Sequence, residues 1–224
     1  TMAVEVESRD CTAVSDAELE AMADLCAEGP NPFTVGFLSK QTELWVLLTE
    51  AREGSRLRGF VFSTLERIGG TPVVVLGAGS VARTSRRSTV LQALVAEQLH
   101  RAVMAFPDED VLMGVRMNDP STFEVFKVLS NVIPRPDHGA NGEERAWGRR
   151  LAKRYRIGNS VYDPRTFLAT GDGGQPAVLD YETLRPERTD PALSDVFAPL
   201  QRDRGDSLVA VAWATAGRLQ RYGD

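Results

Sequence analysis

The sequence predicts an α/β protein: a twisted, mixed and mostly antiparallel sheet with helices on both faces, followed by a C-terminal extension. Three apolar stretches joined by short turns predict neighbouring strands over 43–51, 57–68 and 72–82. Apolar residues at helical spacing over 87–106 predict an amphipathic helix directly after the third strand. Another apolar stretch, 110–117, must then lie beside strands that are already in place.

Composition and charge narrow the class of protein. The chain has 224 residues, 42% of them hydrophobic and 25% charged, which is typical of a soluble globular protein with a sizeable core. Its net charge of -5 disfavours a general nucleic-acid binder, because the whole molecule would repel a polyanion. The longest apolar runs have the length of a strand, so we expect no membrane span.

Few residues are suited to disulfides or metals. Cys11 and Cys26 have no CxxC spacing, which favours a reducing compartment. With only His100 and His138 in the chain, a His-rich metal site is not expected. No basic stretch followed by an apolar core opens the sequence, so we expect no secretory signal and a cytoplasmic location.

The first elements follow from local patterns. Alternating apolar and acidic residues over 3–8 predict a half-buried strand. Ser15, followed three residues later by Glu18, predicts a capping box and a helix that ends before Gly29. A short helix or a loop is expected over 32–40. Further along, Pro120 suits the first turn of a helix that we expect to reach Leu129.

The sequence signals for helices and strands become weaker beyond residue 135. We divide the chain into a core of residues 1–135 and an extension or insertion of residues 136–224. A basic helix is expected over 143–158, and 162–176 is rich in turn residues. The stretch 207–215 is apolar on both faces, as in a strand covered on both sides. Two arrangements remain open: this strand returns to the core sheet, or the extension forms a small lid domain.

The stretch SVARTSRRSTVLQAL, residues 80–94, places Arg83, Arg86 and Arg87 where a strand ends and a helix begins. The first N–H groups of a helix are unpaired and carry partial positive charge, so forked arginine donors around them favour a phosphate site. The alternative is a solvated basic turn in which Ser85, Ser88 or Thr89 caps the helix. Both interpretations stay open.

The element order resembles the GNAT superfamily of acyl-CoA-dependent N-acyltransferases over residues 1–135. In that family, an Arg-Gly-x-Gly-x-Gly loop at the helix start wraps the pyrophosphate of acetyl-CoA. Arg86 matches the loop arginine, and Asn118 matches, within about one residue, the asparagine of the family's Asn-x-x-Ala…Tyr-x-x-x-Gly signature. The resemblance implies acetyl-CoA or another acyl-CoA as co-substrate, and these cofactor-binding residues: Arg83, Arg86, Arg87, Ser88, Thr89, Val90, Leu91 and Asn118.

The sequence also departs from the family pattern. Arg87, Thr89 and Leu91 stand where glycines are usual, and their side chains would crowd a pyrophosphate. Phe126 falls near the tyrosine that often protonates the leaving thiolate, and phenylalanine has no proton to donate. Gly77 and Gly79 have two interpretations: they form a bulge that opens a cleft for the pantetheine arm, or they allow close packing beneath a helix.

Two classes of function follow. The first is transfer of an acyl group to an amine of a small molecule or peptide, with a backbone N–H of the strand over 72–82 polarising the thioester carbonyl. Candidate catalytic residues are Glu66 and His138, and Tyr155, Tyr162 or Tyr181 are candidate replacement acids. The second is a binding or regulatory protein of the same fold without turnover; changed chemistry, or another thioester carrier, is a third option. A homodimer, common in the resembling family, is a further expectation.

Overall fold

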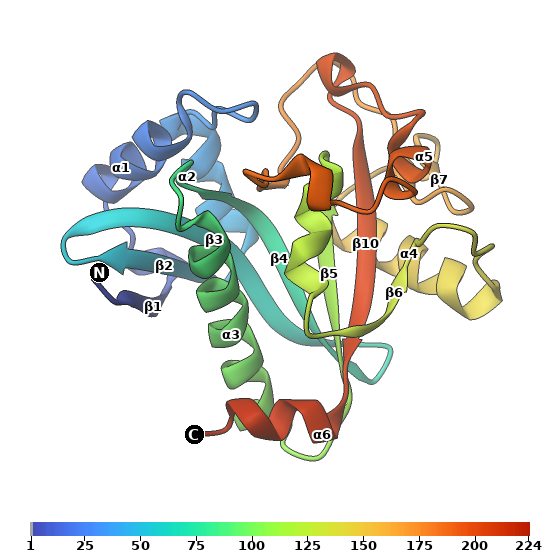
Figure 1. Cartoon of the computed structure of the whole chain (residues 1–224), viewed down its shortest axis with the longest axis horizontal. Helices are drawn as coiled ribbons and strands as arrows, with labels where there is room; N and C mark the ends of the chain where they lie inside the picture. Colours follow the sequence, from blue (N-terminus) through green and yellow to red (C-terminus); the bar gives the residue numbers. More distant parts are fainter. Residues whose placement is uncertain (1) are drawn as a thin grey trace.

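Most neighbouring strands of the sheet are also consecutive along the chain, and two of the links between them are short turns. The computed structural model describes residues 2–224 (Figure 1). The strands are β1 (Val4–Asp10), β2 (Leu47–Glu53), β3 (Arg56–Ile68), β4 (Thr71–Val81), β5 (Val111–Met117), β6 (Ser130–Ile133), β7 (Tyr162–Asp163), β8 (Leu168–Ala169), β9 (Leu179–Asp180) and β10 (Ser207–Ala214).

The helices are interspersed among these strands along the chain. The α-helices are α1 (Asp16–Cys26), α2 (Val35–Leu44), α3 (Arg87–Ala105), α4 (Gly142–Arg154), α5 (Leu193–Phe197) and α6 (Ala216–Leu219). Short 3₁₀ helices are η1 (Cys11–Ala13), η2 (Pro120–Phe126), η3 (Pro186–Arg188), η4 (Arg202–Arg204) and η5 (Gln220–Tyr222).

The sheet is mixed and mostly antiparallel, which confirms the predicted fold class. Its strand order is β1-β2-β3-β4-β5-β10-β8-β7, with β6 beside β10 and β9 beside β4. Only β4–β5 and β4–β9 are parallel pairs among the described strands. The late strand β10 pairs along its length with β5, so the extension is woven into the same sheet.

Helices cover both faces of the sheet, as predicted. One buried cluster joins α1, α2 and α4 to the sheet, and a second joins α3, η2 and α6 to the opposite face. The capping box predicted at Ser15 is present, with the Ser15 N–H donating to Glu18 at 2.7 Å. Asn141 and Glu144 form a second box that begins α4.

The expected helix from Pro120 to Leu129 is instead the 3₁₀ helix η2, and β6 begins at Ser130. The reason lies in its side chains: the hydroxyls of Ser121 and Thr122 donate to the carbonyl of Tyr181, at 3.3 and 2.9 Å. Such bonds to a foreign backbone hold the segment in place without an α-helical register.

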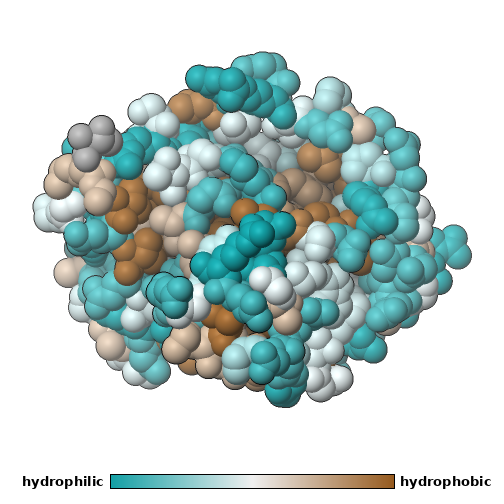
Figure 2. Space-filling model, turned by 60° about the horizontal axis from the view of Figure 1, so that its bottom comes forward, coloured by the Kyte–Doolittle hydropathy of each residue, from teal (hydrophilic) through white to brown (hydrophobic). Residues whose placement is uncertain are grey.

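The surface is mixed in polarity. Figure 2 shows apolar residues reaching the surface in patches among hydrophilic ones. The large apolar side chains that are most exposed are Met2, Val35, Val46, Met104, Val161 and Leu184. Within residues 2–224, the helices lack the length and apolar content that a membrane crossing requires.

Candidate functional site

The central feature of the site is a split between β4 and β5. The two strands pair in parallel only from Val73–Leu112 to Leu76–Val115. Directly after Leu76 the β3–β4 register shifts, because Ser63 pairs with Leu76 but Val61 pairs with Gly79. Two residues of β4 therefore face one residue of β3, which is a β-bulge. The bulge turns the end of β4 away from β5 and opens a groove in the sheet.

The chain fills this groove with its own strand, β9. Leu179 pairs with Gly79, and Asp180 pairs with Ser80, both in parallel. The Gly79 N–H donates to the carbonyl of Val178 at 3.1 Å. Strand β9 also contacts β5, so it lies between the separated strands. The Gly79 N–H is thus already bonded within the chain.

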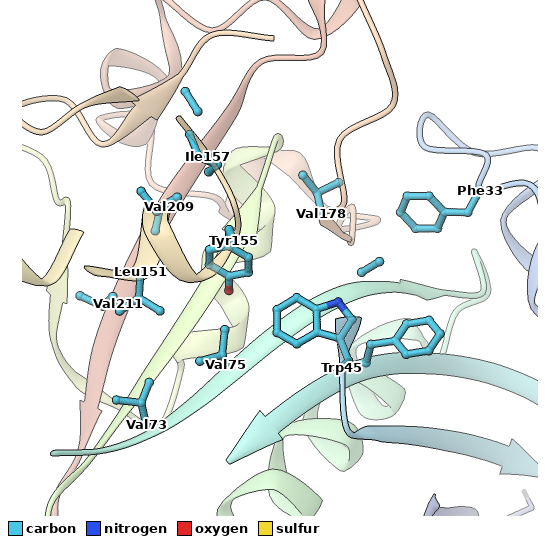
Figure 3. Close-up of a cluster of buried hydrophobic side chains, with 14 of the residues drawn as sticks. Phe33, Trp45, Val73, Val75, Leu151, Tyr155, Ile157, Val178, Val209 and Val211 are labelled. Atoms are coloured by element: carbon cyan, nitrogen blue, oxygen red, sulfur yellow. The ribbon is translucent and has the colours of Figure 1, made fainter. Parts of the chain in front are cut away.

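The residues around β9 project to both faces of the sheet, as in any interior strand. Val178 joins the buried cluster that contains Phe33, Trp45 and Tyr155 (Figure 3). Leu179 joins the opposite cluster, beneath α3. Val178 is 0% exposed and Leu179 1% exposed. Residues 178–179 therefore belong to both cores and are not a loop resting on the surface.

Both glycines of β4 make room for close neighbours. A Cβ on Gly79 would lie 2.8 Å from a methyl carbon of Leu179 and 2.7 Å from the carbonyl oxygen of Phe60. A Cβ on Gly77 would lie 2.4 Å from the indole of Trp45. The structure shows the bulge at Gly77, and it shows both glycines packed against side chains, Gly77 against Trp45 and Gly79 against Leu179. A role of the bulge toward a pantetheine arm stays a prediction.

Two of the three loop arginines hold the segment that contains β9. The Arg83 guanidinium donates to both carboxylate oxygens of Asp180, at 3.1 and 3.3 Å. Arg87 donates from Nη1 to the carbonyl of Glu182 at 2.9 Å, and from Nε to that of Thr84 at 3.1 Å. The cationic loop therefore binds the chain itself.

Arg86 points away from the groove. Its guanidinium pairs with Glu53 of β2 at 2.7 Å and also donates to the carbonyl of Met2. The sequence predicts a phosphate as the partner of Arg86, whereas in the structure its guanidinium is engaged by the Glu53 carboxylate of β2.

The Asp180 carboxylate is a buried charged group at the centre of this arrangement. Its side chain is fully buried. Burial raises the pKa of Asp180, while the charge of Arg83 beside it acts in the opposite direction. A buried carboxylate of this kind must stay paired, so the Arg83–Asp180 bridge fixes β9 in the groove.

The first turn of α3 differs from a phosphate cradle. Val90 and Leu91 are each 1% exposed, and the Val90 N–H donates to the carbonyl of Arg86. Neither residue presents a group to a ligand, which corrects their assignment as cofactor-binding. Within residues 2–224, the N–H groups of Ser88 and Thr89 have no hydrogen-bond partner.

A carboxylate from η2 lies against this first turn. Glu124 accepts a hydrogen bond from the hydroxyl of Ser88, and its other oxygen accepts from the hydroxyl of Tyr181 at 2.6 Å. A carboxylate near a helix N-terminus is stabilised by the partial positive charge there. Glu124 therefore supplies some of the negative charge that a phosphate would bring.

Asn118 and Phe126, the other residues that the sequence predicts at the groove, contact other side chains of the protein. Asn118, at the end of β5, exchanges two amide hydrogen bonds with Asn31, at 2.8 and 3.1 Å. Its amide oxygen also accepts from Arg202 at 3.4 Å. Phe126 is 3% exposed and packs edge-on against Phe123, so it is a core residue.

The structure places both candidate catalytic residues away from the groove. Glu66 pairs with Val73 across β3–β4, well before the bulge, and accepts from Arg154 at 2.6 Å. His138 bonds to Glu144 at 2.8 Å, beside the start of α4. Glu66 thus bridges β3 to α4, and His138 bridges the loop before α4 to its first turn.

The three tyrosines proposed as replacement acids are buried. The hydroxyl of Tyr155 donates to the carbonyl of Leu76 at 2.6 Å, just before the bulge. Burial raises the pKa of Tyr155 and of Tyr162, and it raises that of Tyr181 with help from the charge of Glu124. Raised pKa values make these phenols poorer acids near neutral pH.

A large hollow remains beside the filled groove. It has a volume of about 710 Å³ and lies between the start of α3, η2 and residues 181–193. Its wall includes Arg87, Ser88, Phe123, Glu124, Lys127 and Arg185. This size is within the range of small-molecule pockets, about 300–1,000 Å³. Sequence reasoning missed this hollow and β9, because the stretch VLDYE has no turn or strand signal that sets it apart.

No protein-family model matches the chain, and no curated protein matches its sequence. Solved structures similar to it include a GNAT-family acetyltransferase from Bacillus cereus ATCC 10987, at 13% identity over 60% of this chain and 91% of that one, with a TM-score of 0.38. The ribosomal-protein-S18-alanine N-acetyltransferase of Escherichia coli matches at 10% identity, over 63% and 86% of the two chains, with a TM-score of 0.39. An acyl-CoA N-acyltransferase from Pseudomonas aeruginosa matches at 15%, over 50% and 79%, with a TM-score of 0.38.

Proposed function

We propose that this chain is a GNAT-type protein that binds a ligand without acyl transfer, because its acyl-CoA groove is closed by its own strand. The observation behind the proposal is the pairing of β9 with β4 beyond the bulge. In the resembling family, the pantetheine arm would pair with β4 at this place. Here the Gly79 N–H is bonded to Val178, so an acyl-CoA must displace a strand to enter.

Displacing β9 is costly. It would expose Val178 and Leu179, and full burial of such a side chain contributes about 1.5–3 kcal/mol. It would also separate the buried carboxylate of Asp180 from Arg83, which leaves an unpaired charge. A cofactor that binds only the open state loses apparent affinity in proportion to the rarity of that state.

The residues that would perform the chemistry are missing as well. Phe126, which falls near the position of the family's usual acid, has no proton to donate and is buried. In the part of the chain that the structure describes, the side chains of Glu66 and His138 make no hydrogen bond to β4, β5 or α3. Binding is the function that the remaining hollow supports.

A second candidate is an acyl-CoA N-acyltransferase whose acceptor is an amine of a small molecule or peptide. The bulged β4 and the unbonded N–H groups of Ser88 and Thr89 favour it, since both features suit an acyl-CoA. This candidate requires β9 to leave the groove before each turnover.

Two measurements on the full chain separate the candidates. The first is release of thiol from acetyl-CoA with a panel of amines, beside an established N-acetyltransferase. The second is hydrogen exchange at the Gly79 amide, with and without millimolar CoA. We expect no thiol release and an unchanged exchange rate at Gly79. Loss of protection at Gly79 on adding CoA would show that CoA displaces β9, and thiol release that depends on the amine would show that the chain is an acyltransferase.

A further inference from the structure

A positive charge in the interior of the sheet has no counter-ion. Arg116 lies on β5 and pairs with Val209 of β10, which is 0% exposed and belongs to the apolar cluster of Figure 3. Arg116 itself is partly buried, and within residues 2–224 it forms no salt bridge. Burial lowers the pKa of its guanidinium, the hydroxyl of Tyr155 acts in the opposite direction, and no carboxylate of the described chain contributes. Charges in such places are normally paired, because an isolated one is costly to remove from water.

The Arg116 guanidinium uses only part of its hydrogen-bonding capacity. Its Nε donates to the hydroxyl of Ser207 at 2.9 Å, whereas its two terminal amino groups have no hydrogen-bond partner in the described chain. The register of the β5–β10 pair puts Ser207 level with Asn118. The Arg116 side chain therefore runs toward the end of β5, where Asn118 lines a pocket.

This pocket at the end of β5 is small and polar. Its volume is about 300 Å³, at the lower end of the range of small-molecule pockets. Asn31 and Asn118 line it although they are only 2% and 6% exposed. Gln175, at the rim, donates to the amide oxygen of Asn31 at 2.9 Å, and its own amide oxygen has no partner within residues 2–224. The wall thus holds amide groups in fixed positions, and amides both donate and accept hydrogen bonds.

The charge of the wall selects the kind of ligand. Asp203 lines the pocket, but it is exposed and has no effect on the pKa of Arg116. The other cation of the wall, Arg202, is paired with Glu182 at 3.3 Å. A carboxylate carries a single negative charge, and its two oxygens fit the two terminal amino groups of a guanidinium. A phosphate monoester, with about -1.5 to -2 charges at pH 7, would exceed what Arg116 leaves unbalanced.

We infer that the pocket at the end of β5 binds a small carboxylate that also carries an amide, with Arg116 on the carboxylate and with Asn31 and Gln175 on the amide. The inference goes beyond the proposed function, because it assigns a ligand class to a pocket that shares no wall residue with the hollow beside α3. It joins a strand of the core, the segment after α1 and the extension in one site.

Succinamate is a suitable probe, because a short aliphatic spacer joins its carboxylate to its amide. Succinamide lacks the charge, and 4-methylpentanoate has an isopropyl group in place of the amide. We expect succinamate to raise the melting temperature and to bind in calorimetry, and the other two to bind at least about tenfold more weakly. Equal binding by succinamide would exclude Arg116 as the partner, and equal binding by 4-methylpentanoate would exclude the amide contacts. Either result, or no binding of millimolar succinamate, would overturn the inference.

Variants locate the site. Arg116→Gln should weaken succinamate at least about tenfold and leave succinamide unchanged. Arg149→Gln is the matched control, because it removes an exposed cation of α4 that forms no salt bridge in the described chain, and it should change affinity little. If Arg116→Gln does not fold, the exposed Gln175→Glu replaces it, since a second carboxylate in the pocket should repel the first. Binding that ignores both pocket substitutions, or that Arg149→Gln weakens equally, refutes the assignment.

Failure of this inference differs from failure of the proposed function. If thiol is released from acetyl-CoA in an amine-dependent way, the proposed function is wrong, whether or not succinamate binds. If the Gly79 amide stays protected with CoA, no thiol is released and succinamate does not bind, only the pocket at the end of β5 is wrongly assigned.

Discussion

Replacing Leu179 by alanine tests the closed groove most directly. Leu179 is 1% exposed, and its methyl group lies close to the Cα of Gly79. In the wild type, opening β9 exposes Val178 and Leu179, at about 1.5–3 kcal/mol each. It also breaks the Gly79–Val178 hydrogen bond, which contributes about 1 kcal/mol. The open state is therefore populated at roughly one part in 10³ to 10⁵.

A buried Leu→Ala substitution costs about 2–5 kcal/mol. In Leu179→Ala this cost falls mainly on the closed state, since the side chain is exposed when β9 is open. The Gly79 amide should then exchange about 30- to 4,000-fold faster than in the wild type. Exchange followed by NMR or mass spectrometry measures this ratio residue by residue, provided that reclosing is faster than exchange.

The matched control is Leu99→Ala, in the C-terminal half of α3. Leu99 is 0% exposed and belongs to the same face of the core as Leu179, but it has no place in β9. This variant should lower global stability while leaving local opening at Gly79 close to that of the wild type. If Leu179→Ala exchanges at Gly79 within about threefold of the wild type, β9 does not gate the groove and the reasoning fails.

Three further predictions concern stability. Gly77→Ala should cost about 1–3 kcal/mol in denaturant unfolding, because its Cβ would overlap the indole of Trp45. Asp206 has its pKa lowered to about 2, mainly by the Arg204 guanidinium, so its stabilisation is present above the unfolded pKa and is lost as pH falls through about 2. Asp206→Asn should therefore lower stability by about 2–3 kcal/mol at pH 7 and remove that slope in acid melts. Tyr155→Phe should cost about 1–3 kcal/mol in the same melts, because the carbonyl of Leu76 is left unpaired; no change in stability would contradict this.

The fold was predictable where local patterns and tertiary packing agree. The meander over β2, β3 and β4 follows from short turns between apolar runs, and the Ser15–Glu18 box defines the start of α1. Strand β10 is apolar on both faces and does lie inside the sheet. For these elements, the sequence within and directly around each segment is enough to predict its secondary structure.

The site was less predictable, because its contacts join distant segments. Arg83 was expected beside a phosphate, and its actual partner, Asp180, is 97 residues away. A two-residue strand has no period from which to recognise it. The same loop charge suits an external phosphate or an internal carboxylate equally well, so composition alone does not distinguish them.

Strand β9 lies between β4 and β5, which come from a distant part of the chain. This arrangement predicts an order of folding. Gly79 and Leu179 are a hundred residues apart in sequence, and closing so long a loop has a large entropic cost. The strand gains its contacts only once β4, β5 and α3 are assembled around the gap. We therefore expect β9 to dock after the rate-limiting step, so that substitutions in it speed unfolding and leave the folding rate nearly unchanged. The lifetime of the folded protein would then depend in part on how firmly this two-residue strand is held.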